Sequence, residues 1–503
     1  MWPSWQWVAA VLVGLACLCA HAVAEALWLR PRRLERQFAR QGVRGPRYRF
    51  FVGSTMEMLR LTKEALSRPM DPSDPHGILP RVLAFYPPCR KLYGPKHLIW
   101  FGTKPRLMIS SPELIREVLV VQAEHFDRYE AHPLICQFEG YGLTNLNGDA
   151  WARHRRILSP AFHTENLKPI VPFIADTVRR MCDELAASSG GGGEAEVEVA
   201  KWFGPLPQEV IMLATLGRRN YEAGRAVFEL QEELGGLFDH AHTKVFVPGY
   251  RFLPLRSNVR VWCLVRKIRK GLAALIADLQ VDDDEGGVMR DFMSFMAPAM
   301  TKNEMIEESK NLFFAGKETL SSLLTWATIS LAMHPEWQDR ARQEVLAIVG
   351  RHELPTKDHL PKLKTLAMIV NETLRLYPSV VATIRTAKRD LELDGCVVPA
   401  GTELMIPILA VHHDEEHWGA DATKFNPARF GEQRQRHQMA FLPFGAGQRV
   451  CIGQNLALME AKVALAVVLQ RFVFRLSPAY VHAPHLITMV HPQHGAPVIF
   501  RPL

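Results

Sequence analysis

The stretch from Phe441 to Val468 constrains this chain more than any other part of its sequence. It reads FLPFGAGQRVCIGQNLALMEAKVALAVV, so a glycine-rich loop leads through Cys451 into an apolar pattern typical of a long helix. A cysteine just ahead of a helix lies near unpaired backbone N–H groups, which favour the thiolate over the thiol. A lone cysteine is more often an inert core residue, but the surrounding glycines and the planar donor fork of Arg449 favour a binding site.

Composition limits the class of protein that can carry this loop. The chain has 503 residues, 48% of them hydrophobic, which is enough for a large core and excludes disorder and fibre. The eight cysteines are scattered without paired spacing, which indicates free thiols in a reducing compartment. The net charge of +8 could suggest nucleic acid, but eight arginines crowd into residues 30–49 beside a hydrophobic terminus. We therefore expect no nucleic-acid partner.

The N-terminus has the pattern of a membrane anchor. The apolar run from Trp5 to Leu29 can span a bilayer of about 30 Å at about 1.5 Å per residue. Five arginines follow at residues 30–40, and the positive-inside rule then places the remaining chain in the cytosol. A cleaved signal peptide is the alternative, but no basic residue precedes the run. The sequence predicts an anchor at 1–29, a basic and proline-containing hinge at 30–50, and one large domain at 51–503.

Helical patterns dominate the rest of the chain. A capping box at Thr301 and Glu304 begins an apolar pattern that stops before Pro335. This helix would span roughly 45 Å, so we expect it to cross the core. Further expected helices are Glu336–Val349, Leu363–Tyr377 and Gln454–Phe474, and expected strands are His97–Trp100, Arg106–Ile109 and parts of Leu391–Leu404 and Leu486–Phe500. We predict a mainly α fold of the α+β class, with a long central helix and small β-sheets.

Three segments invite other interpretations. Ser188–Glu198 is low in complexity and is predicted to be a surface loop between two helices. The acidic run at 282–285 lacks the alternating ligands of a calcium loop, so a solvated turn is preferred. His412, His413 and His417 could suggest a metal site, but no cysteine or carboxylate completes a usual zinc pattern. A structural role is preferred for these histidines.

Several motifs accompany the cysteine loop. Ala315-Gly316-Lys317-Glu318-Thr319 lies inside the long helix, where a glycine costs about 1 kcal/mol relative to alanine and indicates a flat neighbour at close range. Glu372 and Arg375 share one face of a helix at i and i+3, and Phe425–Phe430 contains Arg429. Trp151 precedes Arg155 by one helical turn.

Together these motifs resemble the landmarks of the cytochrome P-450 haem-thiolate monooxygenases, in the same order and over essentially the whole chain. The loop Phe444-x-x-Gly447-x-Arg449-x-Cys451-x-Gly453 is similar to the family's ligand loop. The resemblance implies the cytochrome P-450 fold, with Cys451 as the axial ligand of the iron of haem b, iron protoporphyrin IX. It also implies a set of cofactor-binding residues: Arg449, Trp151, Arg155, Arg385, Phe444, Ala315 and Gly316.

The same resemblance assigns two further groups of residues. Glu318 and Thr319 would deliver protons, through water, to the bound oxygen. The alternative for Thr319 is a hydrogen bond within its own helix. Glu372, Arg375 and Arg429 would form a buried triad that braces the cysteine loop.

The chain lacks a phosphate-binding loop and a dinucleotide fingerprint, so electrons must come from a partner protein. The resemblance implies NADPH–cytochrome P-450 reductase. Arg153, Arg156 and Lys462 could form a surface for an acidic donor, with scattered solvent-facing charge as the alternative. The resemblance and the anchor together predict a single-pass protein of the endoplasmic reticulum membrane whose catalytic domain is cytosolic.

Within the family, the sequence is most similar to plant members that hydroxylate brassinosteroids at C-26 and so inactivate these hormones. The segments that carry this similarity include HPL at 132–134, WARHRRILSPAF at 151–162, VPGYRFLP at 247–254 and GAPVIF at 495–500. The alternatives are oxidation of a gibberellin or another terpenoid, a reductase-independent hydroperoxide isomerase or lyase, and a non-catalytic haem or sterol binder. The intact Glu318-Thr319 pair disfavours the isomerase.

Some positions depart from the family pattern. Leu320 follows Thr319 where another hydroxylic residue is common, and Ser379 stands where a second proline is common. Residues 206–241 also diverge. Three largely apolar segments are predicted to form the substrate pocket: Leu134–Leu146, Ser379–Ile384 and Ile487–Val490.

Overall fold

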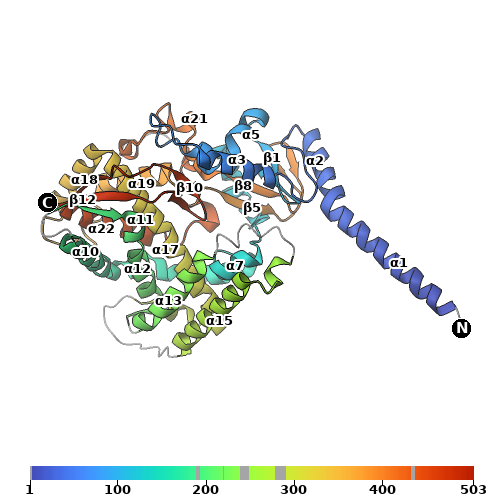
Figure 1. The fold of residues 1–503 in the computed structure, drawn as a ribbon, viewed down its shortest axis with the longest axis horizontal. Helices are drawn as coiled ribbons and strands as arrows, with labels where there is room; N and C mark the ends of the chain where they lie inside the picture. The colour runs from blue at the N-terminus through green and yellow to red at the C-terminus, as the bar shows by residue number, and fades with distance from the viewer. Residues whose placement is uncertain (1–2, 189–192, 219, 238–248, 278–289, 432–436) are drawn as a thin grey trace. The chain divides into compact units, whose positions relative to one another are not determined.

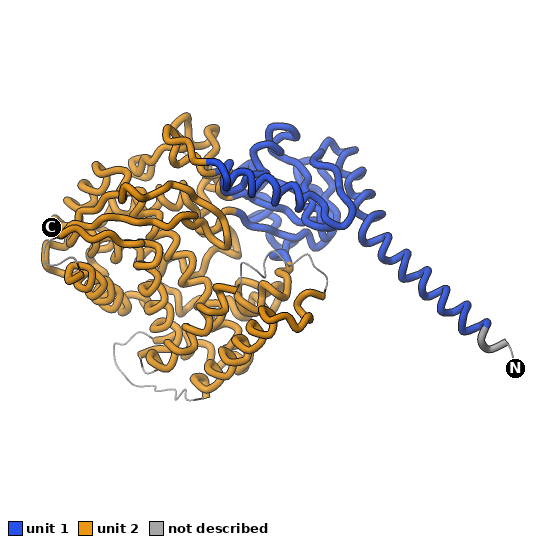
Figure 2. Tube along the Cα trace, in the orientation of Figure 1, with its two compact units in different colours: residues 1–68, 79–129, 382–407 blue, residues 69–78, 130–381, 408–503 orange. Residues whose placement is uncertain are grey.

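The computed structural model describes residues 3–188, 193–218, 220–237, 249–277, 290–431 and 437–503. The acidic run at 282–285 therefore lies outside the described residues. The chain divides into two compact units (Figure 2). Unit 1 comprises residues 1–68, 79–129 and 382–407, and unit 2 comprises residues 69–78, 130–381 and 408–503.

Unit 1 begins with the predicted apolar helix. Helix α1 (Pro3–Ala24) continues through a π-helical turn (Glu25–Leu29) into α2 (Arg30–Arg40). Its apolar window has a mean hydropathy of 2.2 and is not buried by other parts of the chain, so it is a candidate membrane span. The other helices of unit 1 are α3 (Thr55–Ser67), α4 (Leu79–Val82), α5 (Tyr86–Tyr93) and α6 (Pro112–Arg116), the last extended by a π-helical turn (Glu117–Val121).

Unit 1 also contains a five-stranded sheet, ordered β1-β2-β8-β5-β3. Its strands are β1 (His97–Phe101), β2 (Lys104–Met108), β3 (Phe126–Arg128), β5 (Thr383–Ala387) and β8 (Glu403–Ile406). Strands β2 and β8 run parallel, whereas the other neighbours are antiparallel. A second, two-stranded sheet pairs β6 (Leu391–Leu393) with β7 (Cys396–Val398). The predicted strands at 97–100 and 106–109 are confirmed to within two residues at each end.

Residues 30–50, the segment predicted as a hinge after the anchor, are partly helical and contact the sheet of unit 1. Residues 30–40 are helical, and the carbonyl of Arg44 accepts a hydrogen bond from the N–H of Leu98 in β1 at 3.0 Å. Val43 is buried, and a Cβ at Gly45 would clash with the carbonyl oxygen of Leu98. The backbone of this segment therefore packs on the sheet, a long-range contact that its Gly and Pro content did not indicate.

The long helix α17 (Lys302–Met333) forms the centre of unit 2 (Figure 1). Its N-terminus has the predicted capping box between Thr301 and Glu304. The helices packed against it include α7 (Pro133–Glu139), α12 (Pro205–Leu216), α15 (Arg256–Ala277), α18 (Pro335–Ile348), α19 (Lys364–Leu376) and α22 (Gln454–Arg471). Twenty-one of its side chains are buried, polar ones included, as expected for a helix that crosses a core.

The remaining helices and two small sheets complete unit 2. The helices are α8 (Gly148–Leu158), α9 (Thr164–Leu167), α10 (Val171–Ser188), α11 (Val199–Trp202), α13 (Tyr221–Gly236), α16 (Phe292–Met296), α20 (Ile408–His412) and α21 (Glu415–Trp418). One sheet has the order β4-β12-β9, made of Ala195–Glu198, Pro497–Pro502 and Phe472–Leu476; the other pairs β10 (Pro484–Leu486) with β11 (Val490–Pro492). The mainly α fold with small sheets is thereby confirmed.

Two predicted boundaries were wrong, and both errors involve strand pairing. The predicted loop Ser188–Glu198 ends in a strand, because residues 195–198 pair with β12. The predicted helix Gln454–Phe474 ends at Arg471, because Phe472 begins strand β9, which pairs with the other edge of β12. In both cases the partner is strand β12, at the end of the chain, so local periodicity does not reveal the pairing.

Candidate active site

The backbone of the cysteine loop depends on two of its glycines. Gly445 and Gly447 have φ angles of 71° and 69°, a left-handed conformation that side chains disfavour. The turn is closed by the N–H of Cys451, which donates to the carbonyl of Phe444 at 2.9 Å. Gly453 is different, because its φ is −87° and an added Cβ would make only ordinary contact with Phe162. The first two glycines explain the shape of the loop that presents the sulfur.

Cys451 lies immediately ahead of α22 and experiences opposing effects. Burial raises the pKa of its thiol, whereas the backbone N–H groups of Gly453 and Gln454 and the guanidinium of Arg155 lower that pKa. The residue is exposed to solvent, although protein atoms crowd the sulfur. This is the electrostatic setting of a sulfur that becomes a thiolate when a metal binds it.

Helix α8 holds the loop through the residues that the sequence singled out. Arg155 donates to the carbonyl of Val450 at 2.9 Å, next to Cys451. Arg449 donates to the carbonyl of Leu146 at 3.0 Å and to Oδ1 of Asn147 at 2.8 Å. Its guanidinium carbon also lies 4.4 Å from the centre of the Trp151 ring, in cation–π geometry. The structure thus brings Trp151, Arg155, Arg449 and Cys451 together.

Arg385 belongs to the other unit. It lies on β5, is 9% exposed and donates to Oγ1 of Thr383 and to the carbonyl of Ile384, both at 3.0 Å. Its place in the cofactor site stays a prediction.

The expected buried triad is present beneath the loop. Arg375 forms a bidentate pair with Glu372, both N–O distances being 2.8 Å, and Nε of Arg429 lies 3.1 Å from the same carboxylate. None of the three side chains is more than 2% exposed. A second carboxylate, Asp421, accepts from Arg429 at 2.9 Å and balances the additional positive charge. Such a network is costly to break, because one lost partner leaves a charge buried without compensation.

His412 connects this triad to the cysteine loop. Its Nδ1 lies 3.2 Å from the carbonyl of Arg375, and its Nε2 accepts from the N–H of Leu442 at 2.8 Å. The imidazole is therefore neutral with its proton on Nδ1. His413 likewise bonds to the carbonyl of Leu376 at 3.0 Å. These contacts support the structural role predicted for His412 and His413.

Helix α17 presents the motif Ala315–Thr319 in the same unit. Oγ1 of Thr319 donates to the carbonyl of Ala315 at 2.8 Å, which is the within-helix bond that the sequence offered as an alternative. The carbonyl of Thr319 accepts from the hydroxyl of Ser379 at 2.8 Å, so this departure from proline provides a hydrogen bond at the motif itself. Leu320 is buried.

Gly316 has a packing role that the sequence did not indicate. A Cβ added to it would lie 2.7 Å from Cγ1 of Ile211 on α12, closer than real Cβ contacts. The glycine is therefore explained by the close approach of two helices. That Ala315 and Gly316 also border the cofactor stays a prediction.

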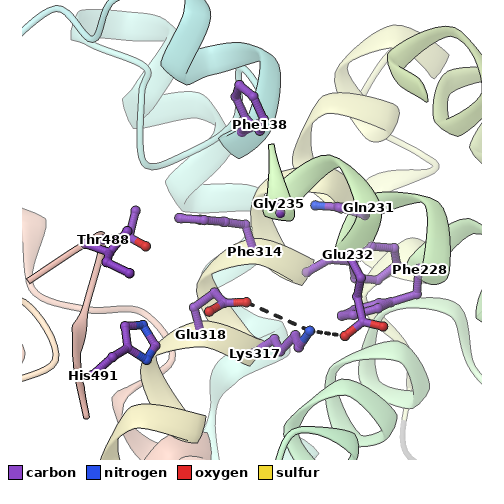
Figure 3. A pocket seen from close by; sticks show the side chains of 13 residues that line it. Phe138, Phe228, Gln231, Glu232, Gly235, Phe314, Lys317, Glu318, Thr488 and His491 are labelled. Atoms are coloured by element: carbon purple, nitrogen blue, oxygen red, sulfur yellow. Dashed lines mark hydrogen bonds and ion pairs between the residues drawn. The ribbon is translucent and has the colours of Figure 1, made fainter. Parts of the chain in front are cut away.

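A cavity of about 870 Å³, its open mouth included, lies beside Glu318 (Figure 3). Of the predicted pocket segments, it uses Phe138 from Leu134–Leu146 and Ile487 and Thr488 from Ile487–Val490. Helix α13 supplies a wall that sequence reasoning missed, and the full lining is Phe138, Phe228, Gln231, Glu232, Gly235, Gly236, Phe313, Phe314, Lys317, Glu318, Ile487, Thr488 and His491. The sequence sign of this wall was that residues 206–241 depart from the family pattern, and this departure did not reveal that α13 lines the cavity.

The residues present fit a haem held by a thiolate. Cys451 has backbone N–H donors to stabilise a negative sulfur, and two guanidinium groups stand next to it in the loop and on α8. A carboxyl group, Glu318, faces a cavity in the same unit, and burial raises its pKa.

Comparison with known proteins identifies the family. The cytochrome P-450 family profile matches residues 82–496. Cytochrome P-450 734A5 of Oryza sativa subsp. japonica is 67% identical over 96% of this chain and 93% of its own length, and cytochrome P-450 734A1 of Arabidopsis thaliana is 50% identical over 95% and 93%. Secologanin synthase 2 of Catharanthus roseus is 37% identical over 99% and 97%. The chain belongs to the cytochrome P-450 family and is a monooxygenase with a haem-thiolate cofactor.

Proposed function

We propose that this enzyme hydroxylates an unactivated C–H bond of a steroid hormone, and that the reaction is brassinosteroid C-26 hydroxylation, which inactivates the hormone. The observation that carries the reaction type is the coexistence in one unit of the Cys451 loop and of Glu318 beside a cavity with four phenylalanines. The subfamily segments and the 67% identity to a 734A relative support the substrate class.

The proposed reaction consumes one O2, two electrons from NADPH and two protons. One oxygen atom enters the substrate as a hydroxyl group, and the other leaves as water. In unit 2, Cys451, Arg449, Trp151, Arg155 and Phe444 would hold haem b, which would supply the oxygen activation, as is general for thiolate-ligated haems of this family.

Two side chains on α17 handle the protons. Burial raises the pKa of Glu318, so its carboxyl retains a proton to higher pH than an exposed glutamate and can act as a donor. Thr319 already donates to Ala315, but the lone pairs of its hydroxyl remain able to accept from water.

We propose NADPH–cytochrome P-450 reductase as the electron donor. Of the three basic residues considered for its docking surface, Arg156 is exposed. Arg153 is engaged by Glu304 and by the carbonyl of Ala299, and Lys462 contacts the carbonyl of Leu360 at 3.4 Å. Scattered charge therefore describes these residues better than one continuous patch.

We further propose a single-pass anchor at residues 1–29 in the endoplasmic reticulum membrane, with 51–503 acting as one cytosolic catalytic domain. Deletion of residues 1–29 should release the protein from membranes and leave haem binding intact, because the apolar window of α1 is not buried by other parts of the chain. Fractionation and haem spectra of the truncated protein check this prediction. Full membrane retention, or loss of the haem spectrum, would contradict it.

The substrate is tested with microsomes that contain this protein and the reductase. Brassinosteroids, gibberellins and other terpenoids are offered separately, and products are identified by mass and fragmentation. We expect a brassinosteroid product that is one oxygen atom heavier, modified at C-26 and dependent on NADPH. Oxidation of a gibberellin or terpenoid alone would replace the steroid assignment, and turnover of a hydroperoxide without reductase would favour the isomerase alternative.

A further inference from the structure

Lys317 lies between two carboxylates at the wall of the cavity. Its Nζ pairs with Oε1 of Glu232 on α13 and lies 3.9 Å from Oε1 of Glu318, its neighbour on α17 (Figure 3). The Lys317 side chain is only 16% exposed, so its charge depends on these partners more than on water. One lysine charge is therefore shared unequally between two acids.

The contacts of Lys317 hold its ammonium closer to Glu232 than to Glu318. The contact of Lys317 with Glu232 is a direct hydrogen bond, whereas the distance to Glu318 is close to the outer limit for an ion pair. The Lys317 ammonium also lies 5.6 Å from the centre of the Phe228 ring, which belongs to α13 as well. Both contacts draw Lys317 toward α13 and away from Glu318.

The charged and titratable groups that line the cavity around Glu318 come from three elements. They are Lys317 on α17, Glu232 on α13 and His491 on β11. Helix α7 contributes Phe138 to the cavity wall, and the segment before β11 contributes Ile487 and Thr488. None of these three residues is charged. Glu232 is thus the only acid besides Glu318 among the residues that line this cavity in the described structure.

We infer that Glu232 is a positioning residue for proton delivery: by holding Lys317 on α13, it leaves the Glu318 carboxyl unpinned and able to gain, turn and release a proton. This inference rests on the proposed role of Glu318. The proposed role needs Glu318 to change protonation state in each turnover, whereas a tight Lys317–Glu318 pair would keep it as a fixed carboxylate.

The neighbouring charges determine in which direction each variant should shift the pKa of Glu318. Burial raises the pKa of Glu318, Lys317 lowers it, and Glu232 raises it. Removal of the Glu232 charge also frees Lys317 to approach Glu318, so both effects of Glu232→Gln lower the pKa of Glu318. Lys317→Met removes the opposing cation and raises that pKa. An ion pair that ties α13 to α17 without influence on Glu318 would leave the midpoint of Glu318 in place in both variants.

The first test follows the Glu318 carboxyl by infrared titration of the holoenzyme. The protonated-carboxyl band absent from Glu318→Gln identifies the group. We expect its midpoint to move by about one pH unit downward in Glu232→Gln and upward in Lys317→Met. Glu233→Gln is the matched control, because it removes the same charge one residue further along α13, where Glu233 pairs with Arg260. Midpoints that stay together, or move in one direction, overturn the inference.

A second readout measures peroxide released per NADPH across pH with a substrate that the wild type hydroxylates. We expect the alkaline limb, where coupling is lost, to shift to lower pH in Glu232→Gln and to higher pH in Lys317→Met. If Glu318→Gln itself leaves coupling unchanged, the proposed role of Glu318 fails and the inference fails with it. If Glu318→Gln uncouples the enzyme but the two variants have the profile of the wild type, only the role of Glu232 is overturned.

Discussion

Cys451 shows how single residues in this protein combine opposing influences. Burial raises the pKa of its thiol, while Gly453, Gln454 and Arg155 lower it. These surroundings fit the proposed role of Cys451 as an iron ligand, because backbone N–H groups and a guanidinium would stabilise a thiolate. Thr319 is a comparable case: its hydroxyl is satisfied within the helix, so a catalytic role requires it to act while that bond is retained or briefly opened.

Replacing Cys451 with Ala should abolish the red-shifted Soret band that marks thiolate ligation in the reduced carbon monoxide complex. The physical reason is the loss of the only sulfur presented by the Phe444–Gly453 loop. The spectrum is recorded for wild type and variant at equal haem content. Cys182→Ala is a matched control, because Cys182 is buried on α10 and burial raises the pKa of its thiol to about 12. A persistent thiolate band in Cys451→Ala would remove the assignment.

Thr319→Ala should increase peroxide release per NADPH several-fold, because proton delivery to oxygen loses a hydroxyl relay; removing such a group typically costs about 10²–10⁴-fold in the proton-transfer step. Peroxide and product are measured together. Thr325→Ala is the control, since Oγ1 of Thr325 makes the same type of bond, to the carbonyl of Ser321 at 2.7 Å, on the same helix. Equal coupling in both variants would mean that the within-helix bond is the whole role of Thr319.

At the level of elements, the protein positions its site by joining distant segments through buried polar contacts. The 3₁₀ turn at Pro427–Phe430, helix α19 and the cysteine loop are separated in sequence, yet Glu372, Arg429 and His412 connect them. Helices α13 and α17 are joined at the cavity by the Lys317–Glu232 pair. The E-x-x-R spacing indicated the pair at 372 and 375, but the partners Asp421 and His412 carry no recognisable spacing signal.

Glu372→Gln should lower the free energy of unfolding by about 3–5 kcal/mol, because it leaves two buried guanidinium groups without their shared carboxylate. Urea unfolding followed by circular dichroism and by haem absorbance measures the change. Asp339→Asn is the matched control: it breaks another i,i+3 pair, with Arg342, whose acid is 63% exposed. That change should cost less than about 1 kcal/mol. Equal losses in the two variants would contradict the bracing role of the triad.

At the level of the whole molecule, the core is unusually rich in buried histidine. His76 contacts Tyr377 at 2.7 Å and His334 at 3.0 Å, and Tyr377 contacts His482 at 3.3 Å. Burial, together with neighbouring charges, lowers the pKa of His76 well below its usual value. The same causes lower the pKa values of His412 and His413 to about 3. The folded protein therefore holds these rings neutral.

The neutral buried histidines predict that the free energy of unfolding decreases as pH falls. In the unfolded chain these histidines take up protons as pH falls below about 6.5, whereas the folded state does not until much lower pH. For His412 and His413, this contribution is constant above about pH 7, and stability falls as pH decreases from 6.5 toward 3, by roughly 1.4 kcal/mol per pH unit for each ring. Denaturant midpoints between pH 7.5 and 4.5 measure the slope. His412→Gln should reduce it and His163→Gln, at an exposed position, should not; equal slopes would contradict the prediction.

The sequence by itself determined the long central helix and the pair at Glu372 and Arg375, because these depend on local signals: a capping box and an i,i+3 spacing. Its resemblance to a known family supplied the reaction class and the third member of the triad, Arg429. The tertiary structure alone decided what each motif contacts. Gly316 packs against Ile211, Ser379 bonds to the carbonyl of Thr319, residues 195–198 pair with β12, and α13 lines the cavity. Each of these contacts joins segments far apart in the chain, and neither periodicity nor spacing encodes which distant backbone or side chain closes against a given residue.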